Sequence, residues 1–529
     1  MPDASTGENP VPFTLRQSVR VVGAVLATVF AVPYALFVVA APLSLVTPQV
    51  VGDIDLSSTD MLARAITAAT GGLLVAAIAA AGAVGRRVPA HLVCLSGLVM
   101  LAGASLWMRS VGGLGELALA RTVQGAGAGA VLVATLAAAA TFGSVAGRTL
   151  TGAWALSVVG ATAVAPWATY RLPFDTSGEW RAVLAPYPWM LALALAGTAT
   201  VVLAASLPGR LPAGADAHTG TAAEPRTNQP RMDRHAGRLG LPLVLPVVIA
   251  VGDHLLRPSL SPASGTVTLY SLLMVTALAI IGLGAVLLAR AGGWWWGAAP
   301  PVVAAAAAVL TVAGDNAFTV ALFDGGGHWP LATGHVLPAL GGAALAGGLA
   351  VVAGIASPRR VSRTLTVTGL LVAAGAATIP LAGGMAPTAV GTILVWAGVG
   401  LALGATLRVT GAVAGAWVAA GFAVVGALAT MHAETVRTAF TTRAVGDADA
   451  DLTFLRTGFA NAQRTWVVIS CALLLLTTVL VARTVRTSPS APDTALGSGS
   501  AGADLDPETT TVGEQPSLSA DDLPAALPE

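Results

Sequence analysis

Lysine is absent from this chain, and all 27 basic residues are arginines. Charged residues make up only 10% of the sequence, whereas soluble globular domains carry about 25%. This shortage of charge excludes a soluble globular fold. The net charge of +1 also gives no electrostatic basis for binding nucleic acid.

Cysteine is scarce as well, and the two cysteines, Cys94 and Cys471, both fall inside apolar runs. They have neither the spacing of metal ligands nor that of a disulfide framework. A phosphate-binding loop of the Walker type is missing, so ATP is not the evident energy source. Redox chemistry would need His or Cys pairs within the apolar runs, and only scattered ones occur. We therefore expect no metal, no cofactor and no enzymatic activity.

Long apolar runs dominate what is present, and the mean hydropathy is +0.77. About 20 apolar residues in a helix match the thickness of the bilayer hydrocarbon. A helix also satisfies its own backbone hydrogen bonds in lipid, which no other single segment does. The sequence therefore predicts a polytopic membrane protein. The first four runs are Val21–Val46, Leu62–Val84, Leu92–Met108 and Leu117–Phe142.

The lengths of the runs predict an all-α membrane bundle of about fourteen helices. The expected helices are 20–47, 59–84, 90–109, 115–143, 148–170, 184–207, 240–257, 265–289, 297–322, 331–355, 363–384, 387–407, 409–431 and 464–484.

Arginine placement predicts the orientation of this bundle. Arg20, Arg86 and Arg148 fall in loops on one side of the predicted membrane, whereas acidic residues such as Asp53 and Asp175 fall on the other. Short loops rich in arginine stay in the cytoplasm. An even number of helices then places both termini in the cytoplasm, with the protein in the cell membrane.

Two similar loops predict an internal repeat. Gly85, Arg86 and Arg87 follow the second predicted helix, and Arg359 and Arg360 follow the tenth. Duplicated helical halves are common in secondary transporters, which bind substrate between the halves. The alternative is that any cytoplasmic turn attracts arginine. The repeat predicts a cytoplasmic segment 1–19, a six-helix half 20–207, a cytoplasmic loop 208–239, two linking helices 240–289, a second six-helix half 290–485 and a disordered acidic cytoplasmic tail 486–529.

The fourth predicted helix contains Arg121, Gln124 and Gly125 in an otherwise apolar run. An arginine inside a membrane span costs about 2.5–3.5 kcal/mol and is rarely found there without a partner or a wet cavity. This stretch resembles the major facilitator superfamily, whose fourth helix carries an Arg-x-x-Gln-Gly motif. The resemblance implies a role for Arg121 in proton transfer.

The fifth predicted helix contains Gly160, Ala165 and Pro166. It resembles the antiporter motif of the same superfamily, although Ala165 stands where that motif has glycine. Trp180 and Arg181 follow at the place that they occupy in the fourteen-helix drug:proton antiporters, a group that has two extra linking helices. The loop with Gly85, Arg86 and Arg87 resembles the gating motif, but no Asp occurs between Leu62 and Met108.

Asp315 lies far inside the ninth predicted helix, next to Asn316. Because the first helix lacks the Asp of the drug antiporters, we hypothesise that Asp315 takes over proton coupling. The alternative is that Asp315 and Asn316 form a polar pair at a helix end, in contact with water in the outer vestibule. Trp154 and Trp396 lie deep enough to face an apolar substrate in the cavity together with Asn316, unless they serve packing.

These features predict proton-coupled efflux of amphipathic organic compounds or drugs by a secondary transporter. Its partners would be a small amphipathic substrate, protons and membrane lipids. The resemblance implies a monomer. Two alternatives remain open: an exporter of narrow specificity for a lipid or metabolite, and a membrane scaffold protein that transports nothing.

Overall fold

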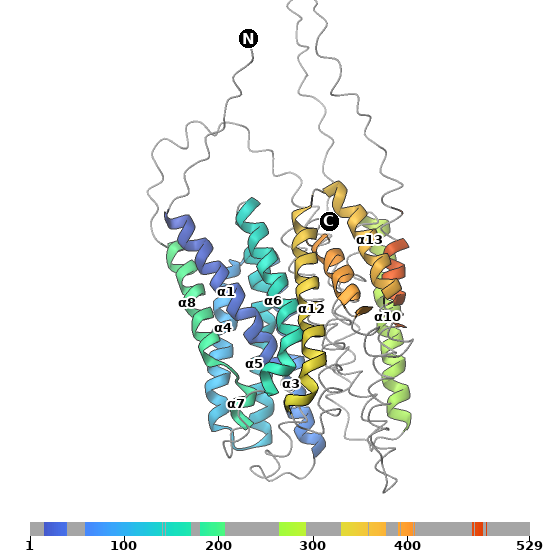
Figure 1. Cartoon of the computed structure of the whole chain (residues 1–529). Coiled ribbons are helices and arrows are strands. Elements are labelled where there is room, and N and C mark those ends of the chain that lie inside the picture. The colour runs from blue at the N-terminus through green and yellow to red at the C-terminus, as the bar shows by residue number, and fades with distance from the viewer. Residues whose placement is uncertain are drawn as a thin grey trace, which may run out of the picture. The chain divides into compact units, whose positions relative to one another are not determined.

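A computed structural model gives the arrangement of the helices (Figure 1). Every regular element formed by the described residues is a helix, which confirms the all-α class. The residues described are 15–39, 59–139, 141–142, 144–170, 180–206, 264–292, 329–357, 359–376, 390–391, 393–405, 407, 468–469, 471–479 and 483.

The helices of the first half agree closely with the apolar runs. Their bounds are α1 (Leu15–Val39), α3 (Thr59–Gly85), α4 (Ala90–Trp107), the 3-10 turn η1 (Met108–Ser110), α5 (Leu114–Ala139), α6 (Ser144–Tyr170), the short α7 (Trp180–Leu184) and α8 (Pro188–Ser206).

Three further full helices follow: α10 (Ser264–Gly292), α12 (Trp329–Ala356) and α13 (Arg359–Ala376). Helical residues are also described within 390–407 and 468–483. The predicted helices 240–257, 297–322 and 409–431 lie outside the described residues, as does the predicted tail, so the count of fourteen stays a prediction.

Five of the described helices are long and apolar enough to cross a membrane. Their outward faces carry large apolar side chains, among them Val75, Leu106 and Leu203, which are 64–68% exposed. In water such a surface would be unfavourable, but in a bilayer it meets lipid chains. The chain is therefore a polytopic membrane protein. The five spans are Gln17–Val39, Ala68–Gly85, Ala90–Ser110, Leu114–Ala139 and Trp180–Ser206.

Consecutive helices run antiparallel, so one end of the bundle collects arginines (Figure 1). At that end α1 begins with Arg20 nearby, α3 ends before Arg86 and Arg87, and α6 begins near Arg148. We call it the arginine-rich end. The positive-inside rule predicts that it faces the cytoplasm.

Glycines bring α5 into direct backbone contact with two neighbours. A Cβ atom added at Gly125 would overlap the Ala69 carbonyl of α3, and Gly127 packs in the same way against Gly97 of α4. Small residues allow such close approach between membrane helices, where dispersion forces replace the hydrophobic effect.

The same arrangement recurs about 270 residues later, as expected of a duplicated half. There Gly398 of the helical segment 393–405 packs against Gly369 of α13, and Gly400 packs against the Gly347 backbone of α12. The contacts between glycines thus follow the order of helices that the internal repeat predicts.

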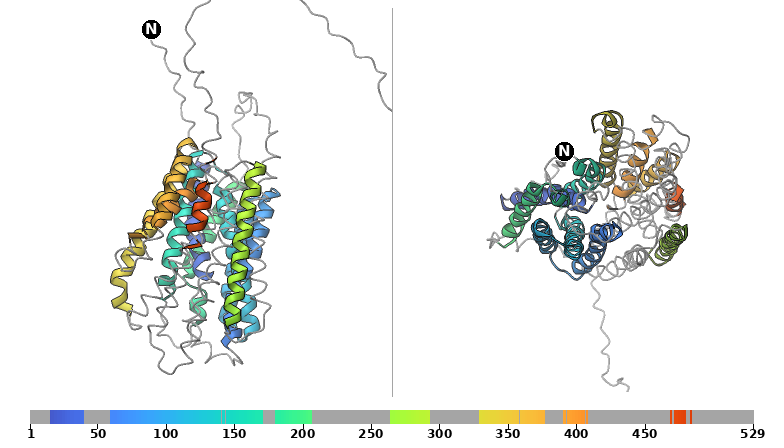
Figure 2. Two further views of the ribbon diagram at one scale, coloured as in Figure 1. Left: turned by 90° about the vertical axis from the view of Figure 1, so that its right-hand side faces the viewer. Right: turned by 90° about the horizontal axis from the view of Figure 1, so that it is seen from below.

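The first half meets the later helices through α6 and α12, which lie side by side (Figure 2). A Cβ at Gly152 of α6 would lie 3.5 Å from Val352 of α12. A Cβ at Gly347 of α12 would lie 3.2 Å from Val159 of α6. This interface is made of small and apolar side chains.

Three predicted boundaries are wrong. Arg359 and Arg360 form the first turn of α13 rather than a loop. Proline suits the position before them, because it has no backbone N–H and the N–H groups at a helix N-terminus have no partner within the helix. α1 starts at Leu15, five residues before the predicted helix start at residue 20, because leucine and arginine favour helix. α8 starts at Pro188 because Tyr187, at a φ of 50°, interrupts the helix.

The turn after α3 ends in a Schellman motif. The Val88 amide donates to the Ala83 carbonyl over 3.1 Å, and the Arg87 amide donates to the Val84 carbonyl over 3.0 Å. Arg87 has a φ of 71°, which is the left-handed position usually taken by glycine. Gly85, Arg86 and Arg87 are all exposed in this turn, as a loop at a membrane surface requires.

Candidate functional site

The Arg121 side chain is completely buried and joins three helices. From α5, its Nε donates to the Ile66 carbonyl of α3 over 3.2 Å. One terminal nitrogen donates to the Val38 carbonyl of α1 over 2.9 Å and to Gln124 Oε1 over 2.8 Å. A single guanidinium therefore ties α1 and α3 to α5.

Gln124 extends this network to a fourth element. Its Nε2 donates to the Leu184 carbonyl, the last residue of α7, over 3.0 Å. Gln124 is itself completely buried. Because its amide accepts from Arg121 and donates to Leu184, the side chain has a fixed orientation.

Helix ends explain why the carbonyl groups are free to accept. The Val38 and Leu184 carbonyls lie in the last turns of α1 and α7, where no amide of the same helix follows to bond them. The partial negative charge at a helix C-terminus also favours a nearby cation. The close packing at Gly125 brings α3, and with it the Ile66 carbonyl, within reach.

Among the described residues, the acceptors of Arg121 are all neutral oxygen atoms. In the part of the chain that the structure describes, only Asp60 and Glu116 are acidic. Glu116 accepts the Gly112 amide at the start of α5, 3.0 Å away. The site thus holds a positive charge without an opposite charge from these residues. Such a cation can bind an anionic group or stabilise the ionised form of a carboxyl group.

The two deep tryptophans pack inside the bundle. Trp154 on α6 is 2% exposed and its indole Nε1 donates to the Leu132 carbonyl of α5 over 3.1 Å. Trp396 is 0% exposed, and its Nε1 has no hydrogen-bond partner within the described ranges. A buried donor without an acceptor is unfavourable by about 1–3 kcal/mol, which leaves Trp396 ready for an acceptor on a ligand.

The remaining predicted residues are placed only in part. α6 contains Gly160, Ala165 and Pro166 and continues to Tyr170, and a Cβ at Gly160 would meet open space. Asp315 and Asn316 lie outside the described residues. Among the described residues, no group of three His, Cys, Asp or Glu side chains is able to hold a metal ion.

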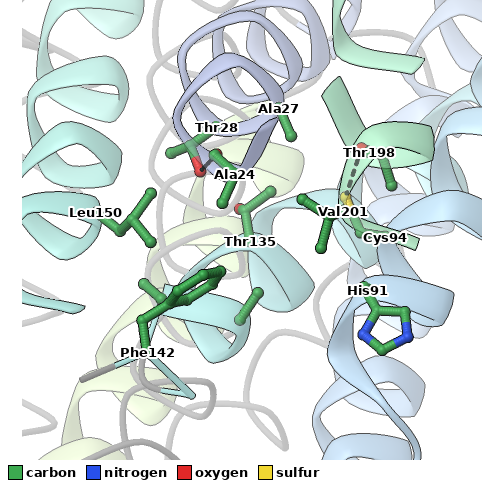
Figure 3. Close-up of a pocket in the computed structure, with 12 residues that line it drawn as sticks. Ala24, Ala27, Thr28, His91, Cys94, Thr135, Phe142, Leu150, Thr198 and Val201 are labelled. Carbon is green, nitrogen blue, oxygen red and sulfur yellow. Dashed lines mark hydrogen bonds between the residues drawn. The ribbon is translucent and has the colours of Figure 1, made fainter. Parts of the chain in front are cut away.

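A second feature, which the sequence did not predict, is a pocket within the first half (Figure 3). It is a half-open pocket between helices α1, α4, α5, α6 and α8 near the arginine-rich end, with about 350 Å³ of space when its open side is included. No single stretch of sequence carries this signal, because each helix contributes only one to three residues. Its lining is Ala24, Ala27, Thr28, His91, Cys94, Thr135, Ala138, Ala139, Phe142, Leu150, Thr198 and Val201.

Comparisons with known proteins give matches only among solved structures. No family model matches the chain, and no curated protein matches it. The proton:xylose symporter XylE is 12% identical, with 89% of this chain and 96% of that chain covered and a TM-score of 0.49. The E. coli fucose:proton symporter FucP is 12% identical, with 89% and 99% covered and a TM-score of 0.49.

A human organic anion transporter, MFSD10, is 13% identical, with 88% of this chain and 100% of that chain covered and a TM-score of 0.48. The first of these structures is described as a major facilitator superfamily protein. The sequence identity and the TM-score are both low for all three structures. We therefore infer the function from the contacts of the chain itself.

Proposed function

We propose that this chain is a secondary transporter of the major facilitator type, which exports amphipathic organic compounds in exchange for protons. The observation that carries the proposal is the buried cation of Arg121, whose hydrogen-bond acceptors within the described part of the chain are all neutral. Arg121, Gln124 and Gly125 are also the residues on which the resemblance to that superfamily rests.

A buried charge has a cost that a purely structural network does not need. Neutral side chains are able to cross-link helices through backbone carbonyls, whereas an arginine inside a span costs about 2.5–3.5 kcal/mol. A fixed cation is useful where a proton must bind and leave, because it stabilises the ionised form of a carboxyl group that approaches it. Arginine keeps its own proton, so Arg121 is the fixed charge rather than the carrier.

We propose Asp315 as the proton carrier and Trp396 as a contact for the substrate. The internal repeat pairs the ninth predicted helix with the first, and Arg121 bonds the first helix at Val38. A carboxyl group that alternates between an apolar environment and the field of Arg121 would load and release one proton per cycle. The unpaired Nε1 of Trp396 offers a donor to a polar atom of an otherwise apolar substrate.

The contact between halves supports alternating access. α6 and α12 meet through Gly152, Gly347 and apolar side chains, so the described contact between them is made by van der Waals packing. We propose that the two halves rock about this contact. We further propose a monomer in the cell membrane with both termini in the cytoplasm, in line with the arginine-rich end.

Transport by purified protein in proteoliposomes with an imposed pH gradient tests this proposal. We expect ethidium, an amphipathic cation, to move against the proton flux. In Asp315→Asn the gradient should no longer drive the dye, while exchange of labelled for unlabelled ethidium continues, because a neutral side chain cannot carry the proton. Asp315→Glu is the matched control and should keep coupled transport.

Two results would contradict the proposal at different levels. Unchanged gradient-driven transport in Asp315→Asn would exclude Asp315 as the carrier and leave the transporter in place. A wild-type protein that moves neither protons nor any of a panel of amphipathic dyes would argue against drug efflux itself. The remaining candidates would then be the exporter of narrow specificity and the scaffold protein.

A further inference from the structure

The pocket in the first half is separate from the Arg121 network and from the contact between halves. Its lining comes only from α1, α4, α5, α6, α8 and the turn at Phe142. Along α1 it runs from Ala24 to Thr28, and Figure 3 shows these residues facing Thr135 and Thr198 across the space. The pocket lies between the helices of one half, so a role in substrate passage between the halves does not explain it.

The walls of this pocket are apolar although three threonines line it. Thr28 Oγ1 donates to the Ala24 carbonyl over 2.8 Å, and Thr135 Oγ1 donates to the Val131 carbonyl over 2.7 Å. Thr198 Oγ1 lies 3.8 Å from the Cys94 sulfur, its bonding partner across the pocket (Figure 3). With their hydroxyl groups engaged, these side chains present mainly methyl groups, so the space suits a short length of hydrocarbon chain.

A cation lies beside the pocket, toward the arginine-rich end. Arg20 is one helical turn before Ala24, and its guanidinium carbon lies 5.6 Å from the centre of the Phe142 ring. The Arg20 Nε is buried and has no hydrogen-bond partner among the residues that the structure describes. His91, which lines the pocket, is near enough to Arg20 for their charges to interact. A buried guanidinium nitrogen without an acceptor is a ready site for an anionic oxygen.

The charge around this end of the pocket is one-sided. Of the residues that the structure describes, only Asp60 and Glu116 are acidic, and both lie in the first turns of α3 and α5, at the opposite end of the bundle. Arg86, Arg87 and Arg148 add positive charge at the same end as Arg20. The field at this end of the pocket therefore favours a negatively charged headgroup over a zwitterionic one.

We propose that this pocket binds an anionic phospholipid of the adjacent leaflet. One acyl chain enters the apolar space between α1, α4 and α8, and the phosphate oxygens accept hydrogen bonds from Arg20, with His91 as a second contact. The lipid would hold α1 against its neighbours in the first half. This inference does not depend on the proposed transport activity.

Native mass spectrometry of the full chain in detergent, with phosphatidylglycerol or phosphatidylcholine added, tests the inference. We expect one tightly bound phosphatidylglycerol and weaker binding of phosphatidylcholine. Arg20→Gln should lower phosphatidylglycerol affinity about ten-fold or more, since a charge-assisted hydrogen bond is lost. The exposed Arg109→Gln, at the opposite end of the bundle, is the matched control and should bind like the wild type.

A second variant tests the apolar space of the pocket. It keeps the inference testable if Arg20→Gln fails to fold. Ala138→Leu puts three extra carbons into the space and should abolish the tight site. Ala79→Leu makes the same change on an exposed face of α3 and should leave it intact. Equal affinity for the two lipids, or tight phosphatidylglycerol binding that survives both Arg20→Gln and Ala138→Leu in monodisperse protein, would overturn the inference. Displacement of the bound lipid by free phosphate would also overturn the inference, because the acyl chain would then contribute nothing to the affinity.

Discussion

Replacement of Arg121 by leucine should lower transport about a hundred-fold or more, which corresponds to about 3 kcal/mol. The Val38, Ile66 and Gln124 acceptors would lose their common donor. Each buried acceptor left unpaired is unfavourable by about 1–3 kcal/mol. We therefore expect a lower melting temperature in detergent together with the loss of transport.

A second substitution at this site tests the charge of Arg121 apart from the hydrogen bonds that Arg121 donates. Gln124→Glu keeps a side chain of the same shape, and the new carboxylate can still accept from Arg121, which lies one turn away, although it can no longer donate to the Leu184 carbonyl. It supplies the opposite charge that the described site lacks. We expect folded protein with gradient-driven transport lost, because the Arg121 charge is then neutralised. Arg121→Lys keeps the charge without the planar fork and should restore only part of the activity.

These variants are read by proton-driven dye transport in proteoliposomes, with size-exclusion profiles as the measure of folding. If Arg121→Leu folds and transports like the wild type, the buried cation has no role in coupling. If Gln124→Glu transports normally, neutral acceptors around Arg121 are not required, and the network serves only to join α1, α3, α5 and α7.

The second large effect is expected from a single methyl group at Gly125. A Cβ there would overlap the Ala69 carbonyl of α3, and a backbone atom cannot swing aside as a side chain does. Gly125→Ala should therefore destabilise the bundle by about 3 kcal/mol or more. Gly400→Ala should behave alike, since its Cβ would overlap the Gly347 carbonyl in the repeated contact.

Gly103→Ala on α4 is the matched control, because a Cβ there meets nothing within 4 Å. Alanine in a helix is favoured over glycine by about 0.8–1.0 kcal/mol, so this variant should be as stable as the wild type or more so. Melting temperatures in detergent and the yield of monodisperse protein measure the difference. Equal stability of Gly125→Ala and Gly103→Ala would show that α3 and α5 are not in backbone contact.

Apolar length was enough to predict most of the described helices. The bilayer sets a length that α3 and α5 must match, and their observed bounds differ from the predicted ones by no more than a few residues. The helix boundaries that were wrong, at Leu15, Pro188 and Arg359, depend on local backbone chemistry at helix ends. A proline such as the one before Arg359 is typical of a turn, yet proline is also common at the start of a helix.

In the site, the sequence predicted the polar side chains but not the backbone groups that they contact. Arg121 and Gln124 could be predicted because polar residues stand out in an apolar run. Their acceptors could not, because the carbonyls of Val38 and Leu184 belong to the backbone and carry no mark in the sequence. The pocket beside Arg20 was missed for a similar reason, since five helices have to meet before it exists. The role of Asp315 stays a prediction.

Spin-label distances across the two halves test the central claim, which is that the halves alternate between two arrangements. One label pair, Arg86→Cys with Ser357→Cys, spans the arginine-rich end, and the other, Ser110→Cys with Val390→Cys, spans the opposite end. Cys94 and Cys471 would first be replaced by serine. We predict two distance populations in each pair, with one end opening as the other closes when pH or substrate changes. A single unchanging population at both ends would contradict the account.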